Sequence, residues 1–203
     1  MKTRILALAL VTGLSACATP TPPAAVVTYS ASGCRAAPDL ATAIPFPPPK
    51  KKAGTVRTAV DATTPCLDIN GSKTPYVVYT MPAVAPLVEV GGAIEQVRVF
   101  PPSVSILGED GATVRTFTPA QYHNRGDRYS VQFVPQAGER YILVTVDQSL
   151  VGTTYEAVTT GVSATYAGTM TWISGVDQVL ARSRSYHGAV VATAFEAPRE
   201  ARR

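Results

Sequence analysis

Short apolar segments separated by turn-forming residues run through the chain from Gly54 to residue 197. The segments are rich in β-branched and aromatic residues, and glycine, proline or aspartate interrupts them about every 8–12 residues. This spacing is typical of an antiparallel sandwich or of a closed antiparallel sheet. It predicts a mainly β domain, an antiparallel β-sandwich over residues 54–197, with at most one short helix.

The individual strands follow from the same pattern. Their predicted ranges are 55–60, 76–81, 87–90, 94–100, 104–107, 113–117, 129–134, 141–146 and 188–195. Turns are predicted at Gly91–Gly92 and at Asp110–Gly111, the second of which gives a hairpin signature. The segment Pro135–Gly138 is expected to join 129–134 and 141–146 as the next pair.

Signals for other structure are sparse. Ala120–Tyr122 is expected to form a single helical turn, and Asp177–Arg184 a short helix with Ser174 or Asp177 near its cap. Residues 151–172 mix glycine, threonine and tyrosine, so either a long loop or a ribbon leaving the core fits them. Residues 198–203 are polar and are expected to form a flexible tail.

The first residues carry the features of an export signal. Lys2 and Arg4 precede the apolar run 5–14, which is too short to span a bilayer as a helix. A basic start followed by such a run is typical of a secretory signal peptide, here residues 1–16. Without this leader the chain has 16 basic and 14 acidic residues, so the mature protein is nearly neutral.

The run ends in Leu14-Ser15-Ala16-Cys17, which resembles the lipobox of bacterial lipoproteins. The resemblance implies that the leader is cut before Cys17 and that this cysteine is acylated. Ala18, rather than aspartate, follows it, which by the same resemblance favours the outer membrane, with the domain in the periplasm. The alternative is an ordinary secretory signal with an incidental cysteine.

Residues 17–53 are expected to form a disordered tether. Eight of the 17 prolines lie between Ala18 and Ala53, and proline disfavours both helices and central strands. The segment is therefore predicted to be extended and to hold the domain away from the lipid. Lys50–Lys52 near its end is either a contact for anionic headgroups or, as we prefer, a solvated charge cluster.

Cys34 and Cys66 remain once Cys17 is acylated. Two leftover cysteines in an oxidising periplasm are expected to form a disulfide, which would pin the end of the tether to the domain. The alternatives are two free thiols or a bond to a partner protein.

Four segments of the second half of the chain resemble the maltose-operon periplasmic protein family. They are Val104–Gly111, Phe117–Tyr122, Arg140–Val146 with the following Leu150–Thr154, and the closing Tyr186–Thr193. The resemblance implies an envelope β-sandwich, and it carries no maltose activity over to this chain.

The sequence gives no sign of an active site. It lacks the hydrolase, β-lactamase, zinc-protease, Cys-x-x-Cys and dinucleotide motifs, and Gly71-Ser72-Lys73-Thr74 is expected to be a turn. Two histidines and three cysteines leave few ligands for a metal. Charged residues make up only 16% of the chain, which argues against nucleic-acid binding. We therefore expect no enzyme, cofactor, metal or nucleic acid.

Two groups of residues are candidates for binding. His123, Asn124, Arg125 and Asp127 form the most polar stretch of the β domain, which is either a ligand loop or, as we prefer, a tight turn between strands. Trp172, with Tyr166 and Met170, is a candidate protein interface, because tryptophan is enriched in interface anchors.

These features predict an accessory module anchored in the outer membrane by lipid, which docks to an envelope assembly such as a pilus, secretin, exporter or surface anchor. The alternative is a glycan-binding lipoprotein. It is suggested by aromatic residues that can stack on sugar rings, namely Trp172 and the tyrosines at 122, 129, 141, 155, 166 and 186.

Overall fold

A computed structural model describes residues 23–48, 52–83 and 85–196 of the chain and confirms the mainly β prediction. The strands are β1 Ala53–Val60, β2 Cys66–Ile69, β3 Ser72–Pro75, β4 Val77–Thr80, β5 Leu87–Ala93, β6 Arg98–Val99, β7 Pro102–Leu107, β8 Thr113–Thr116, β9 His123–Arg125, β10 Arg128–Phe133, β11 Tyr141–Val146, β12 Thr154–Ala167, β13 Met170–Arg184 and β14 Gly188–Phe195. Two short 3-10 turns are η1 Leu40–Thr42 and η2 Pro119–Gln121. The second confirms the turn expected at 120–122.

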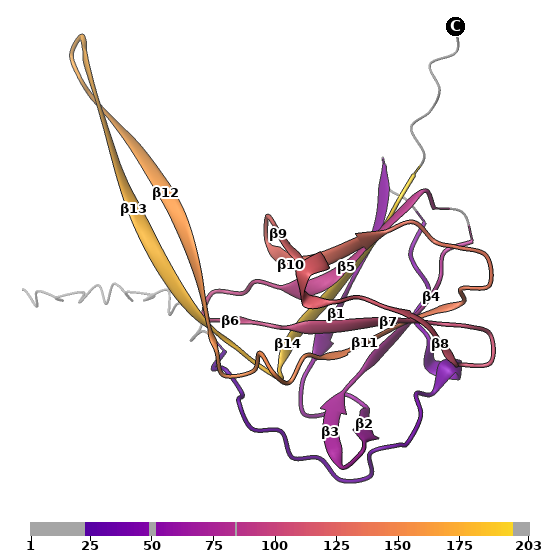
Figure 1. The fold of residues 1–203 in the computed structure, drawn as a ribbon. Helices are drawn as coiled ribbons and strands as arrows, with labels where there is room; N and C mark the ends of the chain where they lie inside the picture. Colours follow the sequence, from indigo (N-terminus) through magenta and orange to yellow (C-terminus); the bar gives the residue numbers. More distant parts are fainter. Residues whose placement is uncertain (1–22, 49–51, 84, 197–203) are drawn as a thin grey trace, which may run out of the picture.

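Two antiparallel sheets form the body of the domain (Figure 1). One sheet has the order β1-β14-β5-β10-β9, and the other has the order β4-β11-β7-β8. Two smaller sheets, β12-β13-β6 and β2-β3, lie at the periphery. Each of the two larger sheets turns alternate side chains toward the other, which is the arrangement of a sandwich.

The core lies between the two larger sheets. It includes Val88 and Val190 from the five-stranded sheet and Ile106 and Ile142 from the four-stranded sheet, all fully buried. Tyr79 is also buried there, and its hydroxyl donates a hydrogen bond of 2.8 Å to Thr58 Oγ1. Burial raises the pKa of Tyr79 to about 12, so the phenol stays neutral and keeps this hydrogen bond.

The glycines at 91 and 92 do not form the predicted turn. Both lie inside β5, which continues to Ala93. The backbone of Phe100 crosses so close to Gly92 that a Cβ there would overlap its carbonyl oxygen. A Cβ at Gly91 would likewise overlap the backbone of Tyr129 and Ser130 in β10, so the glycine pair serves close backbone packing. The strand expected at 94–100 is correspondingly reduced to β6, Arg98–Val99.

The pairing predicted for the strands around Pro135–Gly138 is wrong. β10 pairs with β5 and β9, whereas β11 pairs with β4 and β7 in the other sheet. The connection crosses from one sheet to the other, and Arg140 N at its end already donates to the carbonyl oxygen of Leu107, the last residue of β7. In contrast, the hairpin of β7 and β8 forms around Asp110–Gly111 as predicted.

Residues 23–48 are extended, as predicted, but they lie against the domain instead of holding it away from the lipid. Ile44 bridges the edge of β4, where its amide donates to Val78 O and its carbonyl accepts from Thr80 N. Arg35 makes the same kind of exchange with β2. The prolines exclude a central strand, but they allow these single bridges at strand edges.

The Cys34–Cys66 disulfide is present, with the two Cα atoms 4.7 Å apart. It joins the extended segment to the first residue of β2, as predicted from the cysteine count and the compartment. Cys17, Lys50, Lys51 and the tail 198–203 lie outside the described residues.

Replacing both cysteines of the disulfide with serine is expected to lower the free energy of unfolding by about 3–4 kcal/mol, because the cross-link closes a long loop in the unfolded chain. Urea unfolding of the Cys34→Ser/Cys66→Ser variant, monitored by far-UV circular dichroism, measures the change in the free energy of unfolding. An unchanged unfolding midpoint would show that the backbone bridges alone hold residues 23–48.

Candidate functional site

The most unusual feature of the molecule is a long two-stranded ribbon. β12 and β13 pair antiparallel from Thr154–Ser183 to Ala167–Met170, and no irregularity interrupts the register. At about 3.3 Å per residue the ribbon is about 45 Å long. It stands clear of the sandwich in Figure 1. Of the alternatives for residues 151–172, the structure therefore shows the ribbon.

A tight turn sets the ribbon's register. Gly168 and Thr169 connect the last pair, Ala167 and Met170, and Gly168 has a φ of 64°. Two-residue hairpin loops require such positive φ angles, which glycine adopts without steric strain. The short helix predicted at Asp177–Arg184 is wrong, since these residues belong to β13. Their backbone groups pair with β12, and this pairing overrides the local helical preference.

The base of the ribbon is fixed by polar contacts. Arg182 Nε donates to Glu95 O at 2.7 Å, and Arg184 Nη1 donates to Thr153 Oγ1 at 2.7 Å. The Arg184 guanidinium also lies 5.6 Å from the ring centre of Tyr155. β6 adds a parallel pairing with Ser183 and Arg184. The ribbon therefore leaves the body in a defined direction.

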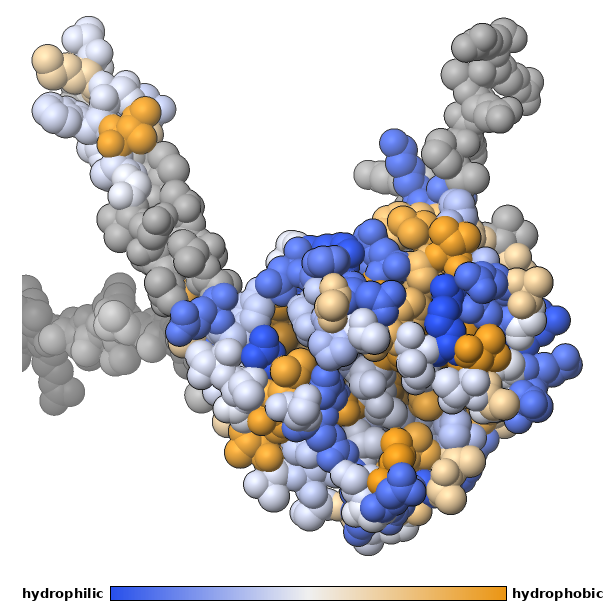
Figure 2. Space-filling model, viewed as in Figure 1, coloured by the Kyte–Doolittle hydropathy of each residue, from blue (hydrophilic) through white to orange (hydrophobic). Residues whose placement is uncertain are grey.

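The tip of the ribbon exposes large apolar side chains. Tyr166 is 76% exposed, Met170 64%, Trp172 65% and Ile173 74%. Figure 2 shows apolar surface near the end of the ribbon, away from the body. We call these four residues the tip cluster. The structure thus brings together the three predicted interface residues, Tyr166, Met170 and Trp172, and adds Ile173, which the sequence interpretation did not include.

The tip cluster occupies both faces of the ribbon. Met170 and Trp172 lie two residues apart on β13 and so share one face. Ile173 lies on the opposite face, as does Thr171, whose cross-strand partner is Tyr166. Exposed apolar side chains are therefore present on both faces of the tip.

The ribbon is also unusual in its charge. No Asp, Glu, Lys, Arg or His occurs in the sequence from 157 to 176. Free strand edges in monomeric proteins are normally protected by charged side chains, especially lysine, or by proline. Contiguous exposed apolar residues mark interaction sites more often than they mark a free surface. This combination makes the ribbon tip the candidate functional site.

The polar stretch at 123–127 forms a short strand and the turn that follows it. His123–Arg125 is β9, and its residues pair with Ser130–Arg128 across a turn at Gly126 and Asp127. Arg125 Nη1 donates to both the carbonyl and the hydroxyl of Ser130, and His123 and Asn124 are exposed. The carboxylate of Asp127 accepts from Arg128 Nε at 3.1 Å. This geometry favours the turn interpretation.

A buried carboxylate lies on the five-stranded sheet, on the face away from the core. Glu89 is 5% exposed and accepts hydrogen bonds from Ser130 Oγ at 3.0 Å and from Gln132 Nε2 at 2.8 Å. Arg128 Nη1 lies 3.7 Å away and donates to Thr193 Oγ1. Because Ser130 is completely buried, it is not available as a nucleophile. The network joins neighbouring strands and is structural.

The Glu89→Ala substitution is expected to lower the free energy of unfolding by about 2–3 kcal/mol, because Arg128 loses a buried partner and Ser130 loses an acceptor. Chemical denaturation measures this loss. Glu109→Ala serves as the control, since Glu109 is exposed, and it should change stability by less than about 0.5 kcal/mol. Equal effects of the two substitutions would contradict the importance of the network.

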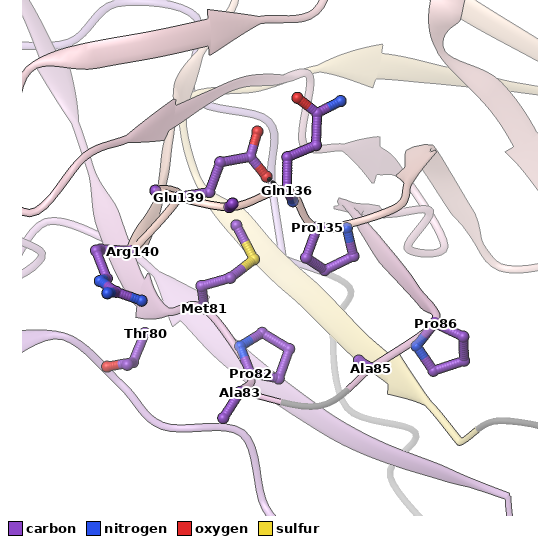
Figure 3. A pocket seen from close by; sticks show the side chains of 12 residues that line it. Thr80, Met81, Pro82, Ala83, Ala85, Pro86, Pro135, Gln136, Glu139 and Arg140 are labelled. Atoms are coloured by element: carbon purple, nitrogen blue, oxygen red, sulfur yellow. Dashed lines mark hydrogen bonds between the residues drawn. The ribbon is translucent and has the colours of Figure 1, made fainter.

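A surface cavity of about 770 Å³ lies where β4 and β10 end. Thr80–Ala83, Ala85 and Pro86 line it on one side, and Pro135–Arg140 lines it on the other (Figure 3). Glu139 at its wall is already engaged, since it lies 2.8 Å from Arg115 Nη2 and accepts from Gln136 N. None of the described lining residues is aromatic. The cavity thus lacks the stacking surface that a sugar ring prefers.

Most of the tyrosines considered for glycan stacking are committed to packing. Tyr122 is buried against Tyr129, with ring centres 5.4 Å apart, and its hydroxyl accepts from Val104 N. Tyr186 stacks on Tyr29 at 5.3 Å. Tyr155 is buried at the ribbon base, and Tyr141 packs beside a small core cluster.

In the part of the chain that the structure describes, no group of three or more His, Cys, Asp or Glu side chains is arranged to hold a metal ion. His187 lies partly buried near the ribbon base, and burial, followed by the charge of Arg98, lowers its pKa. Over the same described residues, no helix has the length and apolarity to cross a membrane.

No protein-family model matches the chain, and neither the curated proteins nor the solved structures include a significant match.

Proposed function

We propose that this chain is a non-enzymatic lipoprotein, anchored in the outer membrane with its domain in the periplasm, that acts as an accessory docking module of an envelope assembly. A pilus, secretin, exporter or surface anchor is the kind of assembly we mean. The observation that carries the proposal is the outer part of the ribbon, residues 157–176, which has no charged residue and ends in the exposed tip cluster.

The energetics of the ribbon support a docked state. An isolated two-stranded ribbon is marginally stable in water, because it has little apolar surface to bury. Full burial of one large apolar side chain contributes about 1.5–3 kcal/mol, and the tip cluster offers four such side chains. A partner that covers them would therefore gain binding energy and would also order the ribbon.

The backbone of the ribbon offers a second source of affinity. The outer edge of β12 has no strand neighbour among the described residues, and β13 has one only at Ser183 and Arg184. A partner strand can add to such an edge through main-chain hydrogen bonds, while its side-chain pockets provide specificity. This mode needs no charged residues, in agreement with the composition of residues 157–176.

The lipid anchor at Cys17 is proposed from the sequence alone. Cys17 follows the small residues Ser15 and Ala16 and a short apolar run with a basic start. Diacyl or triacyl attachment would give stable membrane binding, because each buried CH₂ contributes about 0.8 kcal/mol.

The glycan-binding alternative has less support. It would have to use the exposed aromatic residues of the tip, Tyr166 and Trp172, because the other candidate tyrosines pack inside the domain or against neighbours. Tyr166 and Trp172 lie on opposite faces of the ribbon, so they do not form one platform for a sugar ring.

Affinity purification from native envelopes tests the proposal. Tagged full-length protein would be cross-linked in cells, extracted in mild detergent and analysed by quantitative mass spectrometry. We expect an envelope protein to be recovered in near-stoichiometric amount. Recovery of no protein above the level of an untagged control, together with saturable binding of a defined oligosaccharide, would favour the glycan function instead.

A further inference from the structure

The start of the described chain lies at the base of the ribbon. Arg98 Nη1 contacts Ala24 O at 3.5 Å, and β6, which contains Arg98, pairs with the end of β13. Val26 N donates to Ser185 Oγ, and Val26 O accepts from Tyr186 N. In Figure 1 the indigo segment accordingly begins beside the ribbon base.

This placement limits how far the ribbon base can stand from a lipid on Cys17. The seven residue-to-residue steps from Cys17 to Ala24 span at most about 25 Å when fully extended. The ribbon itself is longer, at about 45 Å. When the segment from Cys17 is fully extended, the tip can touch the anchoring membrane only if the ribbon lies at a shallow angle to the membrane. In every orientation the tip stays within about 70 Å of the membrane, which is the sum of the two lengths.

A lipid surface does not fit the tip well. An element that lies in the membrane interface buries one apolar face and keeps a polar face in water, whereas the tip cluster exposes apolar side chains on both faces. Deeper insertion would place the unpaired backbone groups of the ribbon edges in hydrocarbon, where each costs several kcal/mol. A protein can cover both faces and also pair with an edge.

We propose that the partner is itself a protein bound to the outer membrane and that it encloses the ribbon tip on both faces in an uncharged slot. This inference rests on the proposed docking function and on the lipid at Cys17. Because the described chain begins at the ribbon base, membrane attachment through Cys17 would confine the tip to a layer that a membrane-bound partner shares. Such confinement raises the effective concentration of the partner and increases the apparent affinity by a factor of about 10²–10⁴.

Photo-cross-linking in native envelopes tests this arrangement with the full-length, lipidated chain. A photoreactive residue would replace Thr165, which shares a face with Trp172, or Thr171, which shares a face with Tyr166. Both threonines are exposed, so the tip cluster itself remains intact. Val114, which is 58% exposed on β8, provides the control position. We expect both ribbon probes to label the same protein and the control probe not to label it.

The membrane-bound nature of the partner is tested by repeating the experiment with Cys17→Ser. Loss of the shared membrane should reduce labelling from Thr165 and Thr171 by at least about tenfold at equal protein levels. Unchanged labelling would overturn the membrane-bound partner but leave docking intact. Labelling from only one of the two positions would overturn enclosure on both faces. Adducts with phospholipid instead of protein would show that the membrane covers the tip, and no adduct from either position would refute docking itself.

Discussion

Trp172→Ala and Ile173→Ala are each expected to reduce recovery of the envelope partner by at least about tenfold, and the double variant should abolish it. Anchor residues of this kind contribute about 2–4 kcal/mol in other interfaces, and 1.4 kcal/mol already corresponds to a factor of ten. The two residues are 65% and 74% exposed on opposite faces of the ribbon, so both are available to a partner.

The same substitutions should leave the folded domain almost unchanged, because the tip makes no contact with the core clusters. Thermal unfolding is the appropriate measurement, and we expect the Tm to stay within about 2 °C of the parent. Val114→Ala is the matched control, since it removes an exposed apolar side chain from β8. If Val114→Ala weakens recovery as much as Trp172→Ala, the ribbon has no special role.

Cys17→Ser is expected to move nearly all of the protein from the membrane fraction to the soluble periplasmic fraction. A single acyl chain gives only marginal membrane binding, so stable attachment needs the two or three chains proposed at Cys17, and the substitution removes all of them. Fractionation with metabolic labelling by a fatty-acid analogue measures the change, and Cys34→Ser/Cys66→Ser serves as the cysteine control. Continued acyl labelling of the Cys17→Ser protein would refute the lipobox interpretation.

The sandwich could be predicted from the sequence because its strands are local features. The hairpin of β7 and β8 depends on a glycine at 111 with a φ of 79°, and Asp110–Gly111 signals such a turn directly. The disulfide followed from counting cysteines and from the expected compartment. These predictions needed no information about which strands meet in space.

The incorrect predictions concern long-range contacts. Gln, Leu, Ala and Arg in 177–184 favour a helix locally, but the pairing of β13 with β12 decides their conformation. The glycine pair in β5 has the composition of a turn, yet β10 approaches Gly91 and the backbone of Phe100 approaches Gly92 too closely for a side chain. Likewise, the sequence does not show that the connection between β10 and β11 changes sheets.

The candidate site was only partly predictable. Tyr166, Met170 and Trp172 stood out as aromatic and apolar residues in a segment without a clear strand pattern, and Ile173 beside them carried the same signal. The buried position of Glu89 could not be foreseen, because a charged residue that alternates with valines normally faces solvent. Its partners come from β10, about 40 positions later in the chain.

The central claim is that the ribbon is the docking arm, and a shortened ribbon tests it most directly. Removing residues 158–167 and 170–179 would leave Gly168 and Thr169 as the turn between Ala157 and Leu180, which are already a cross-strand pair. The even number removed from each strand keeps the pairing pattern at the turn. We predict that quantitative affinity purification then loses the partner, while the Tm and the disulfide are retained. Undiminished recovery with the shortened ribbon would contradict the account.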